Sequence, residues 1–162
     1  MQKRSGELDK ARGVIRTVGL TQQEMRSYNM SRIRSSANKS TELSLINFFR
    51  KYSVKGWRRH FPIIGKPDFV FCKQRVVLFV DGCFWHGCTL HYQRPKNNET
   101  YWLSKLTANR RRDQNVNTKL QEKGWTVIRI WEHTVKEINH ADERCLLPRE
   151  LQELLQLVNL QS

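Results

Sequence analysis

Apolar residues concentrate in three short runs that predict β-strands. Residues 75–80 are nearly all apolar, as expected for a strand that is covered on both faces. Residues 69–72 follow a Pro-Asp turn, and residues 125–131 follow Gly124, which is a good helix stop. The three runs predict a small sheet in the middle of the chain.

Helical spacing of apolar residues predicts three helices around these strands. The first begins at Ser40 or Thr41 and continues to about Tyr52, and the last covers residues 146–160. Residues 99–123 are expected to form a long helix. Six of its residues share one side: Trp102, Leu106, Asn109, Asp113, Val116 and Leu120.

The order of these elements predicts an α/β fold with a small mixed sheet and helices on both faces. A strand, a long crossover helix and another strand are typical of a right-handed parallel unit. The 162 residues fit one domain. We expect residues 1–24 to form a flexible basic arm and residues 25–162 to form a single domain.

The charge of the chain changes this picture. Its 29 basic and 15 acidic residues leave a net charge of +14, which favours a polyanionic partner such as nucleic acid. A soluble basic protein without a specific partner is the alternative. We expect no membrane span, because no long apolar run occurs, and no apolar signal-peptide core follows the first residues. A cytoplasmic protein keeps its thiols reduced, so its cysteines are expected to be ligands or core residues.

A group of thiols and imidazoles follows the strand of residues 75–80. Cys83, Cys88 and His91 have spacing that is typical of a loop folded around one zinc ion. His133 is the preferred fourth ligand, because it follows a strand that would end at the same edge of the sheet. Cys72 and Cys145 are alternative fourth ligands, and His86 is an alternative to His91.

A carboxylate at the start of a strand predicts a second metal site. Asp68 would lie close to Val80 if residues 69–72 and 75–80 form a hairpin. A carboxylate, a main-chain carbonyl and waters commonly hold Mg²⁺. A turn-forming role is the alternative for Asp68, and His86 is free to act as an acid, a base or a water-holding group.

Five motifs together resemble one family, and they cover about residues 25–135. They are Arg26-Ser27-x-Asn29-Met30, Gly65-Lys66-Pro67-Asp68-Phe69, Gly82-Cys83-Phe84-Trp85-His86, Tyr101-Trp102-Leu103 with Asn109 to Asp113, and Gly124-Trp125-x-Val127 to Trp131-Glu132. In this order and spacing the chain is similar to the Vsr endonucleases of very-short-patch mismatch repair. The resemblance implies a restriction-endonuclease-like core of the PD-(D/E)xK type, structural zinc, and Mg²⁺-dependent nicking of DNA 5′ of the thymine in a T:G mismatch.

The resemblance also implies roles for individual residues. Asp68 and a main-chain carbonyl near Val80 would bind catalytic Mg²⁺. His86 would be the general base or orient the attacking water, Asp113 would orient His86 or hold a water, and Glu42 would join the surroundings of the site. Zinc would be held by Cys83, Cys88, His91 and His133. The chain departs from some relatives at Asp81, where they have His, and in a longer N-terminal arm.

Aromatic and basic residues beside these sites are expected to contact DNA. By resemblance, Phe84, Trp85 and Trp102 form an intercalating platform, and Asn29 and Met30 approach the other groove. Ordinary burial is the alternative for the rings. Further DNA contacts are expected from Lys66, Asn109, Arg110 and Arg112, for which a solvated surface is the alternative.

These observations favour a DNA-nicking enzyme that acts on T:G mismatches in a short sequence context. The alternatives are a restriction-type endonuclease of the same fold that cuts both strands, and a zinc-stapled DNA-binding module without chemistry. The expected partner is double-stranded DNA, bound by a monomer, with a functional link to a DNA cytosine methyltransferase and to repair proteins.

Overall fold

The structure is a computed structural model that describes residue 21 and residues 39–95, 97–138 and 147–159. The chain divides into two units, Met1–Ala37 and Asn38–Ser162, and the fold below is that of the second unit. Apart from residue 21, the expected arm of residues 1–24 lies outside the described residues. So do Asn29, Met30 and Cys145.

Four strands form one mixed sheet in the order β1-β2-β3-β4. They are β1 (Trp57–Arg58), β2 (Phe69–Phe71), β3 (Val76–Asp81) and β4 (Thr126–Trp131). β2 pairs antiparallel with both β1 and β3, whereas β3 and β4 run parallel, from the pair Val76–Thr126 to the pair Asp81–Trp131. The expected hairpin and the expected parallel unit are both confirmed.

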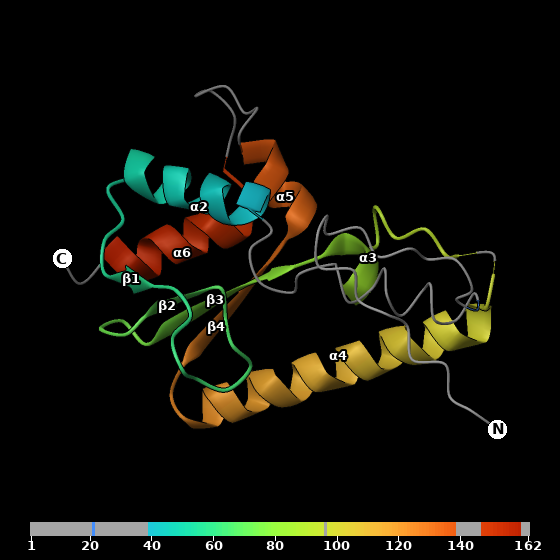
Figure 1. Ribbon diagram of the computed structural model, residues 1–162. Coiled ribbons are helices and arrows are strands. Elements are labelled where there is room, and N and C mark those ends of the chain that lie inside the picture. The colour runs from blue at the N-terminus through green and yellow to red at the C-terminus, as the bar shows by residue number, and fades with distance from the viewer. Residues whose placement is uncertain (1–20, 22–38, 96, 139–146, 160–162) are drawn as a thin grey trace, which may run out of the picture. The chain divides into compact units, whose positions relative to one another are not determined.

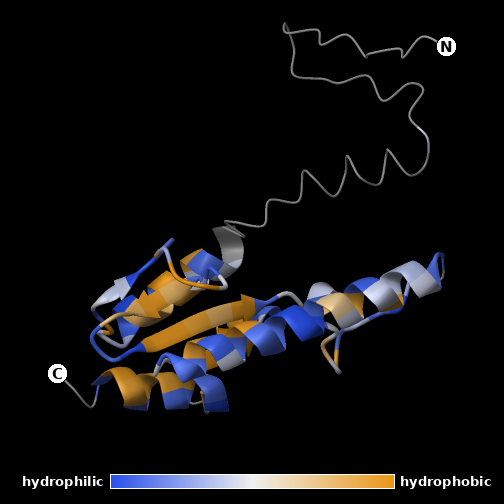
Figure 2. Cartoon of the chain, turned by 90° about the horizontal axis from the view of Figure 1, so that it is seen from below, coloured by the Kyte–Doolittle hydropathy of each residue, from blue (hydrophilic) through white to orange (hydrophobic). Residues whose placement is uncertain are grey.

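Helices cover both faces of this sheet (Figure 1). α2 (Lys39–Lys51), α5 (Glu132–Ile138) and α6 (Arg149–Asn159) pack on one face, where the larger core cluster includes Phe49, Phe69 and Leu151. The long helix α4 (Glu99–Glu122) covers the other face, where Leu120 packs against Val70 and Val77. Figure 2 shows that apolar residues concentrate on the central strands. No helix within the described ranges is both long and apolar enough to span a membrane.

The sequence patterns placed the main elements within a few residues of their observed ends. Gly124 follows α4 with a φ of 73°, in the left-handed region expected of a glycine that ends a helix. Three elements were not expected: β1, the short helix α3 (Cys83–His86) and α5. β1 and α3 are too short for periodicity to reveal, and α5 follows β4 without an intervening turn.

The parallel pairing of β3 and β4 positions the candidate site. Both strands end at the same edge of the sheet, at the pair Asp81–Trp131. The chain continues from β3 through Gly82 into α3, and from β4 directly into α5. Residues that are about 50 positions apart in the sequence are therefore neighbours at this edge, as His133 Nδ1 and Cys83 Sγ are at 3.2 Å.

Candidate active site and metal centre

Asp68 lies at the start of β2 and contacts the neighbouring strand. Its Oδ2 accepts a hydrogen bond from the main-chain N–H of Val80 at 2.7 Å. The contact to Val80 that was expected from the hairpin is present, although it is made by the amide rather than the carbonyl. Burial is the main reason why the pKa of Asp68 is raised, and the carboxylates of Glu42 and Asp81 raise it further, against the effect of the Val80 hydrogen bond. A buried carboxylate with two acidic neighbours fits a bound cation.

Glu42 reaches this region from the first turn of α2. It is 7% exposed, and its carboxylate accepts a hydrogen bond from the guanidinium of Arg59, just beyond β1. The Arg59 pairing places a positive charge next to one of the carboxylates that face Asp68. Glu42 therefore belongs to the surroundings of Asp68, as the resemblance implied.

His86 and Asp113 form a close pair between α3 and α4. His86 Nδ1 lies 2.6 Å from Asp113 Oδ2, and both side chains are largely buried. A carboxylate on Nδ1 holds the imidazole in one orientation and favours the tautomer in which Nε2 is unprotonated. Asp81 Oδ1 lies 3.9 Å from the same Nδ1. Asp81 is thus close to His86 on one side and acts electrostatically on Asp68 on the other.

Arg129 is a largely buried charged residue beside the candidate site that the sequence patterns did not reveal. From the middle of β4 its guanidinium lies 2.6 Å from Asp81 Oδ1 and 3.3 Å from Asp113 Oδ1. The available signal was an Arg within an otherwise apolar strand segment, Val127-Ile128-Arg129-Ile130. A charge in such a position requires partners, which in the structure come from β3 and α4.

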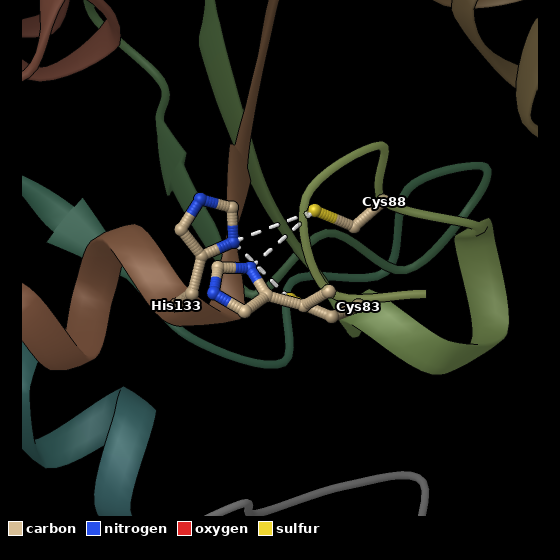
Figure 3. A group of neighbouring side chains, drawn as sticks. Cys83, Cys88 and His133 are labelled. Carbon is tan, nitrogen blue, oxygen red and sulfur yellow. Dashed lines mark hydrogen bonds between the residues drawn. The ribbon is translucent and has the colours of Figure 1, made fainter. Parts of the chain in front are cut away.

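Two thiols and two imidazoles form a compact cluster beyond the ends of β3 and β4. Within the described part of the chain, ligand atoms of Cys83, Cys88, His91 and His133 all lie within 4.8 Å of one another. His133 Nδ1 is 3.2 Å from Cys83 Sγ and 3.6 Å from Cys88 Sγ (Figure 3). Two sulfurs and two nitrogens from four side chains match the tetrahedral ligand preference of zinc.

The pKa values of the two thiols of the cluster are shifted in opposite directions. Burial raises the pKa of Cys83. Burial acts in the same direction on Cys88, but hydrogen bonds, above all from His91, outweigh it and lower the pKa. A lowered pKa favours the thiolate form that binds metal.

Two of the alternative zinc ligands lie elsewhere, and the third, Cys145, is outside the described residues. His86 pairs with Asp113, which leaves His91 as the third residue of the cluster. Cys72 is partly buried and packs against the smaller core cluster with Phe79 and Leu120.

A glycine turn allows α4 to approach the loop that carries these residues. Gly87 ends α3 with a φ of 67°, and a Cβ at this position would lie 2.8 Å from Nη2 of Arg110 and 2.9 Å from Cδ1 of Leu106. The Arg110 side chain in turn donates hydrogen bonds to the carbonyls of Gly87 at 3.0 Å and His86 at 3.4 Å. This side chain therefore fixes the end of α3, in addition to its predicted contact with DNA.

Three aromatic rings form one group where α3 meets α4. The ring centroid of Phe84 lies 5.1 Å from that of Trp85 and 5.2 Å from that of Trp102. The rings are partly exposed and line a small pocket, together with Tyr92, Lys105, Leu106 and Asn109. The three predicted wedge residues are therefore brought together, half-buried rather than in the core.

Asn109 is largely buried where α4 meets α3. It is 8% exposed, and its Nδ2 donates a hydrogen bond to the carbonyl of Trp85 at 2.9 Å. The amide group thus fixes the aromatic helix α3 to α4, because its donor is directed into the protein. Lys66 and Arg112, by contrast, are exposed.

Comparison with known proteins identifies the family. Residues 19–92 match the family model described as DNA mismatch endonuclease Vsr. The type II nicking enzyme V.XorIIP of Xanthomonas oryzae is 37% identical over 125 residues, which are 75% of this chain and 89% of that protein. The type II nicking enzyme V.NaeI of Lentzea aerocolonigenes is 52% identical over 68 residues, and this chain spans only 41% of its length. DNA mismatch endonuclease Vsr of Escherichia coli is 37% identical over 87 residues, which are 52% of this chain and 55% of that protein. The chain belongs to the Vsr family of DNA mismatch endonucleases and is a DNA endonuclease, a phosphodiester hydrolase.

Proposed function

We propose that the protein uses Mg²⁺ to nick double-stranded DNA on the 5′ side of the thymine in a T:G mismatch, within a short sequence context. The observation that carries the proposal is that Asp81 lies close to His86 and acts on the pKa of Asp68, so that a cation-binding carboxylate and a candidate base share one edge of the sheet. The restriction-endonuclease-like core of the PD-(D/E)xK type is part of the same proposal.

Asp68 fits a hard divalent cation better than it fits a turn. The carboxylate is largely buried, its pKa is raised by burial and by Glu42 and Asp81, and one of its oxygens bonds to Val80. Bound there by Asp68 and the Val80 carbonyl, Mg²⁺ would offset charge on the scissile phosphate. The neighbouring Glu42 adds negative charge that favours the cation, and Arg59 partly neutralises that charge.

His86 supplies the proton acceptor. Its Nδ1 is paired with Asp113 at 2.6 Å, so Nε2 is the nitrogen that can take a proton from an attacking water. Asp113 holds the ring in place and stabilises the positive charge that the imidazole gains, as a carboxylate behind a catalytic histidine does. In-line attack of this water on the phosphate would break one strand.

Basic side chains would hold the DNA against this site. Lys66 lies two residues before Asp68 and is exposed, which suits contact with a phosphate next to the cleaved bond. Arg110 and Arg112 on α4 are exposed as well. Their charges are part of the net +14 that favours a polyanion.

Mismatch preference would come from Phe84, Trp85 and Trp102. Inserting apolar rings between base pairs requires unstacking, and a mismatched step resists unstacking least. The rings are held by α3, α4 and the Asn109 hydrogen bond, so they need little ordering when DNA binds. Asn29 and Met30, outside the described residues, would approach the other groove.

The test is to incubate T:G and matched duplexes with the protein and Mg²⁺. In each duplex, one strand carries a 5′ label and the other strand carries a different label. We expect a single nick 5′ of the mispaired thymine and a preference for T:G over matched DNA of at least about tenfold, since one good discriminating contact has this size. Cleavage of both strands of matched DNA would instead indicate the restriction-type alternative. A duplex panel with varied flanking bases would define the sequence context.

Replacing Trp85 with Ala is expected to reduce the preference for mismatched DNA by about tenfold, because stacking of a base on an aromatic ring contributes about 1–3 kcal/mol. The measurement is the ratio of affinities for T:G and matched duplexes, without Mg²⁺. Trp125→Ala is the matched control, since Trp125 lies before β4, at the other end of the sheet, against the smaller core cluster. Equal losses of affinity on both duplexes in the Trp85 variant would contradict intercalation.

The remaining parts of the proposal concern the cell. The three cysteines of the described residues, Cys72, Cys83 and Cys88, are free, which suits the reducing cytoplasm. We propose a monomer on DNA and a functional link to a DNA cytosine methyltransferase, because deamination of a methylated cytosine produces a T:G mismatch.

A further inference from the structure

We propose that Arg129 is a positioning residue that decides which of two carboxylates pairs with His86. The inference rests on the proposed role of His86 as the proton acceptor. Asp113 and Asp81 are both near His86 Nδ1, at 2.6 Å and 3.9 Å, and Arg129 contacts both of them.

Arg129 divides the oxygens of the two acids between different partners. Its Nη1 binds Asp81 Oδ1 at 2.6 Å, which is the same oxygen that faces His86. Its Nη2 lies 3.3 Å from Asp113 Oδ1, which leaves Oδ2 of Asp113 for the imidazole. The guanidinium therefore draws Asp81 away from His86 and aligns Asp113 toward it.

The guanidinium itself is held on two further sides. Its Nε donates a hydrogen bond to Asn117 Oδ1 at 3.1 Å, and its Cζ lies 4.6 Å from the ring centroid of Phe79. The side chain is 20% exposed. A planar group with a stacked ring and three polar partners has little freedom, which is what a fixed bridge between two acids requires.

Removal of the bridge would change the pairing for a simple electrostatic reason. Asp81 would lose the charge that compensates it and would become a second acceptor for the His86 Nδ1–H. Pairing with Asp81 instead of Asp113 would turn the ring, and Nε2 would no longer face the position of the attacking water. Lys could supply the positive charge, but a single ammonium lacks the fork that engages two carboxylates in a fixed plane.

The experiment is a double-mutant cycle on the full-length protein. Single-turnover cleavage of a T:G duplex with Mg²⁺ is measured for wild type, Arg129→Gln, Asp81→Asn and the double variant, with DNA affinity and thermal unfolding measured in parallel. We expect Arg129→Gln to reduce the cleavage rate by about 10- to 100-fold, as the loss of a partner behind a functional histidine does. DNA affinity should stay within about threefold, because Arg129 contacts acids rather than phosphates. The cleavage rate of Arg129→Lys should lie between the rates of wild type and Arg129→Gln.

Asp81→Asn separates this role from a structural one. In the Asp81→Asn background the competing carboxylate is gone, so Arg129→Gln is expected to reduce the rate by less than about threefold. Equal effects of Arg129→Gln in both backgrounds would overturn the inference, because they would mean that Arg129 does not act through Asp81. An Asp81→Asn variant without measurable cleavage would also overturn it, since Asp81 would then be required rather than competing.

Two measurements keep the test decisive. If Arg129→Gln does not fold, Asn117→Ala loosens the guanidinium without removing its charge, and a reduced rate with unchanged DNA affinity is expected. In wild type, ¹⁵N spectra of the imidazoles, with His86→Gln as the assignment control, should show His86 protonated at Nδ1, and the ¹⁵N signature of this nitrogen should shift in the Arg129 variants, because its acceptor changes from Asp113 to Asp81. An unchanged signature would overturn the inference.

If His86→Gln cleaves like wild type, the proposed function fails, whereas an inactive His86→Gln with a fully active Arg129→Gln refutes only the role of Arg129.

Discussion

Replacing Asp68 with Asn should abolish strand cleavage and leave DNA binding largely intact. The substitution preserves an acceptor for the Val80 N–H but removes the charge that would hold Mg²⁺. Because a divalent ion contributes several kcal/mol to stabilising charge at the phosphate, the rate should fall by about a thousandfold or more. DNA affinity without Mg²⁺ should stay within about threefold of wild type. The measurement is nicking of a labelled T:G duplex, with Glu122→Gln, an exposed carboxylate at the end of α4, as the matched control.

The same variant should be more stable than wild type when no metal is present. Since burial and two acidic neighbours raise the pKa of Asp68 in the folded state, the folded protein loses stability as the pH rises from the ordinary aspartate pKa through the raised one. Above that range the destabilisation is complete, and below it the difference between wild type and variant disappears. Thermal unfolding at neutral pH and at low pH measures this. Mg²⁺ should raise the unfolding temperature of wild type but not of the variant.

Two results would contradict this assignment. Cleavage by Asp68→Asn at the wild-type rate would show that this carboxylate is not part of the chemistry. A variant that neither cleaves nor binds DNA, yet unfolds like wild type, would place Asp68 in DNA binding instead. If neither wild type nor the variant cleaves DNA under any metal condition, the result would favour the second alternative, a DNA-binding module without chemistry.

Replacing Cys88 with Ser should remove zinc and much of the folding stability. Zinc binding by structural sites is coupled to folding with apparent free energies on the order of 10 kcal/mol, and a missing thiolate opens the ligand set. The cluster joins the loop after β3 to α5, so its loss should also release the contact between these segments. Metal content by mass spectrometry and the unfolding transition by circular dichroism measure both effects.

Cys72→Ser is the matched control, because Cys72 is a free cysteine that packs against the smaller core cluster rather than with the other thiols. It should retain zinc and unfold near the wild-type temperature. A Cys88→Ser protein that lacks metal, yet is as stable and active as wild type, would exclude a structural role for the site.

The sequence predicted that the two thiols and two imidazoles would lie together, because their placement is largely local. Cys83, Cys88 and His91 lie within one loop, and His133 follows from the parallel alignment of two strands that periodicity already indicated. The pairing of Asp68 with Val80 was also accessible, since a hairpin with a short turn leaves few registers.

The contacts of Arg129 and Asn109 could not be predicted from spacing along the chain. Each is defined by partners from other elements: Asp81 and Asp113 for the arginine, and the carbonyl of Trp85 for the amide. Spacing along the chain says which side of a helix or strand a residue occupies, but not which polar group meets it there. The expected DNA contact of Asn109 stays a prediction, and the structure adds a hydrogen bond to Trp85 that spacing did not reveal.

The long helix α4 has a consequence for how the protein can vary. Trp102, Asn109, Asp113 and Asn117 occupy one stripe of it, and they contact in turn the aromatic group, the carbonyl of Trp85, the imidazole and the guanidinium. One inserted residue would rotate everything beyond it by about 100° and advance it by about 1.5 Å. The helix therefore sets the distance between the aromatic group that we propose to probe base pairs and the proposed site of strand cleavage. These contacts therefore constrain the number of residues in α4 between Trp102 and Asn117.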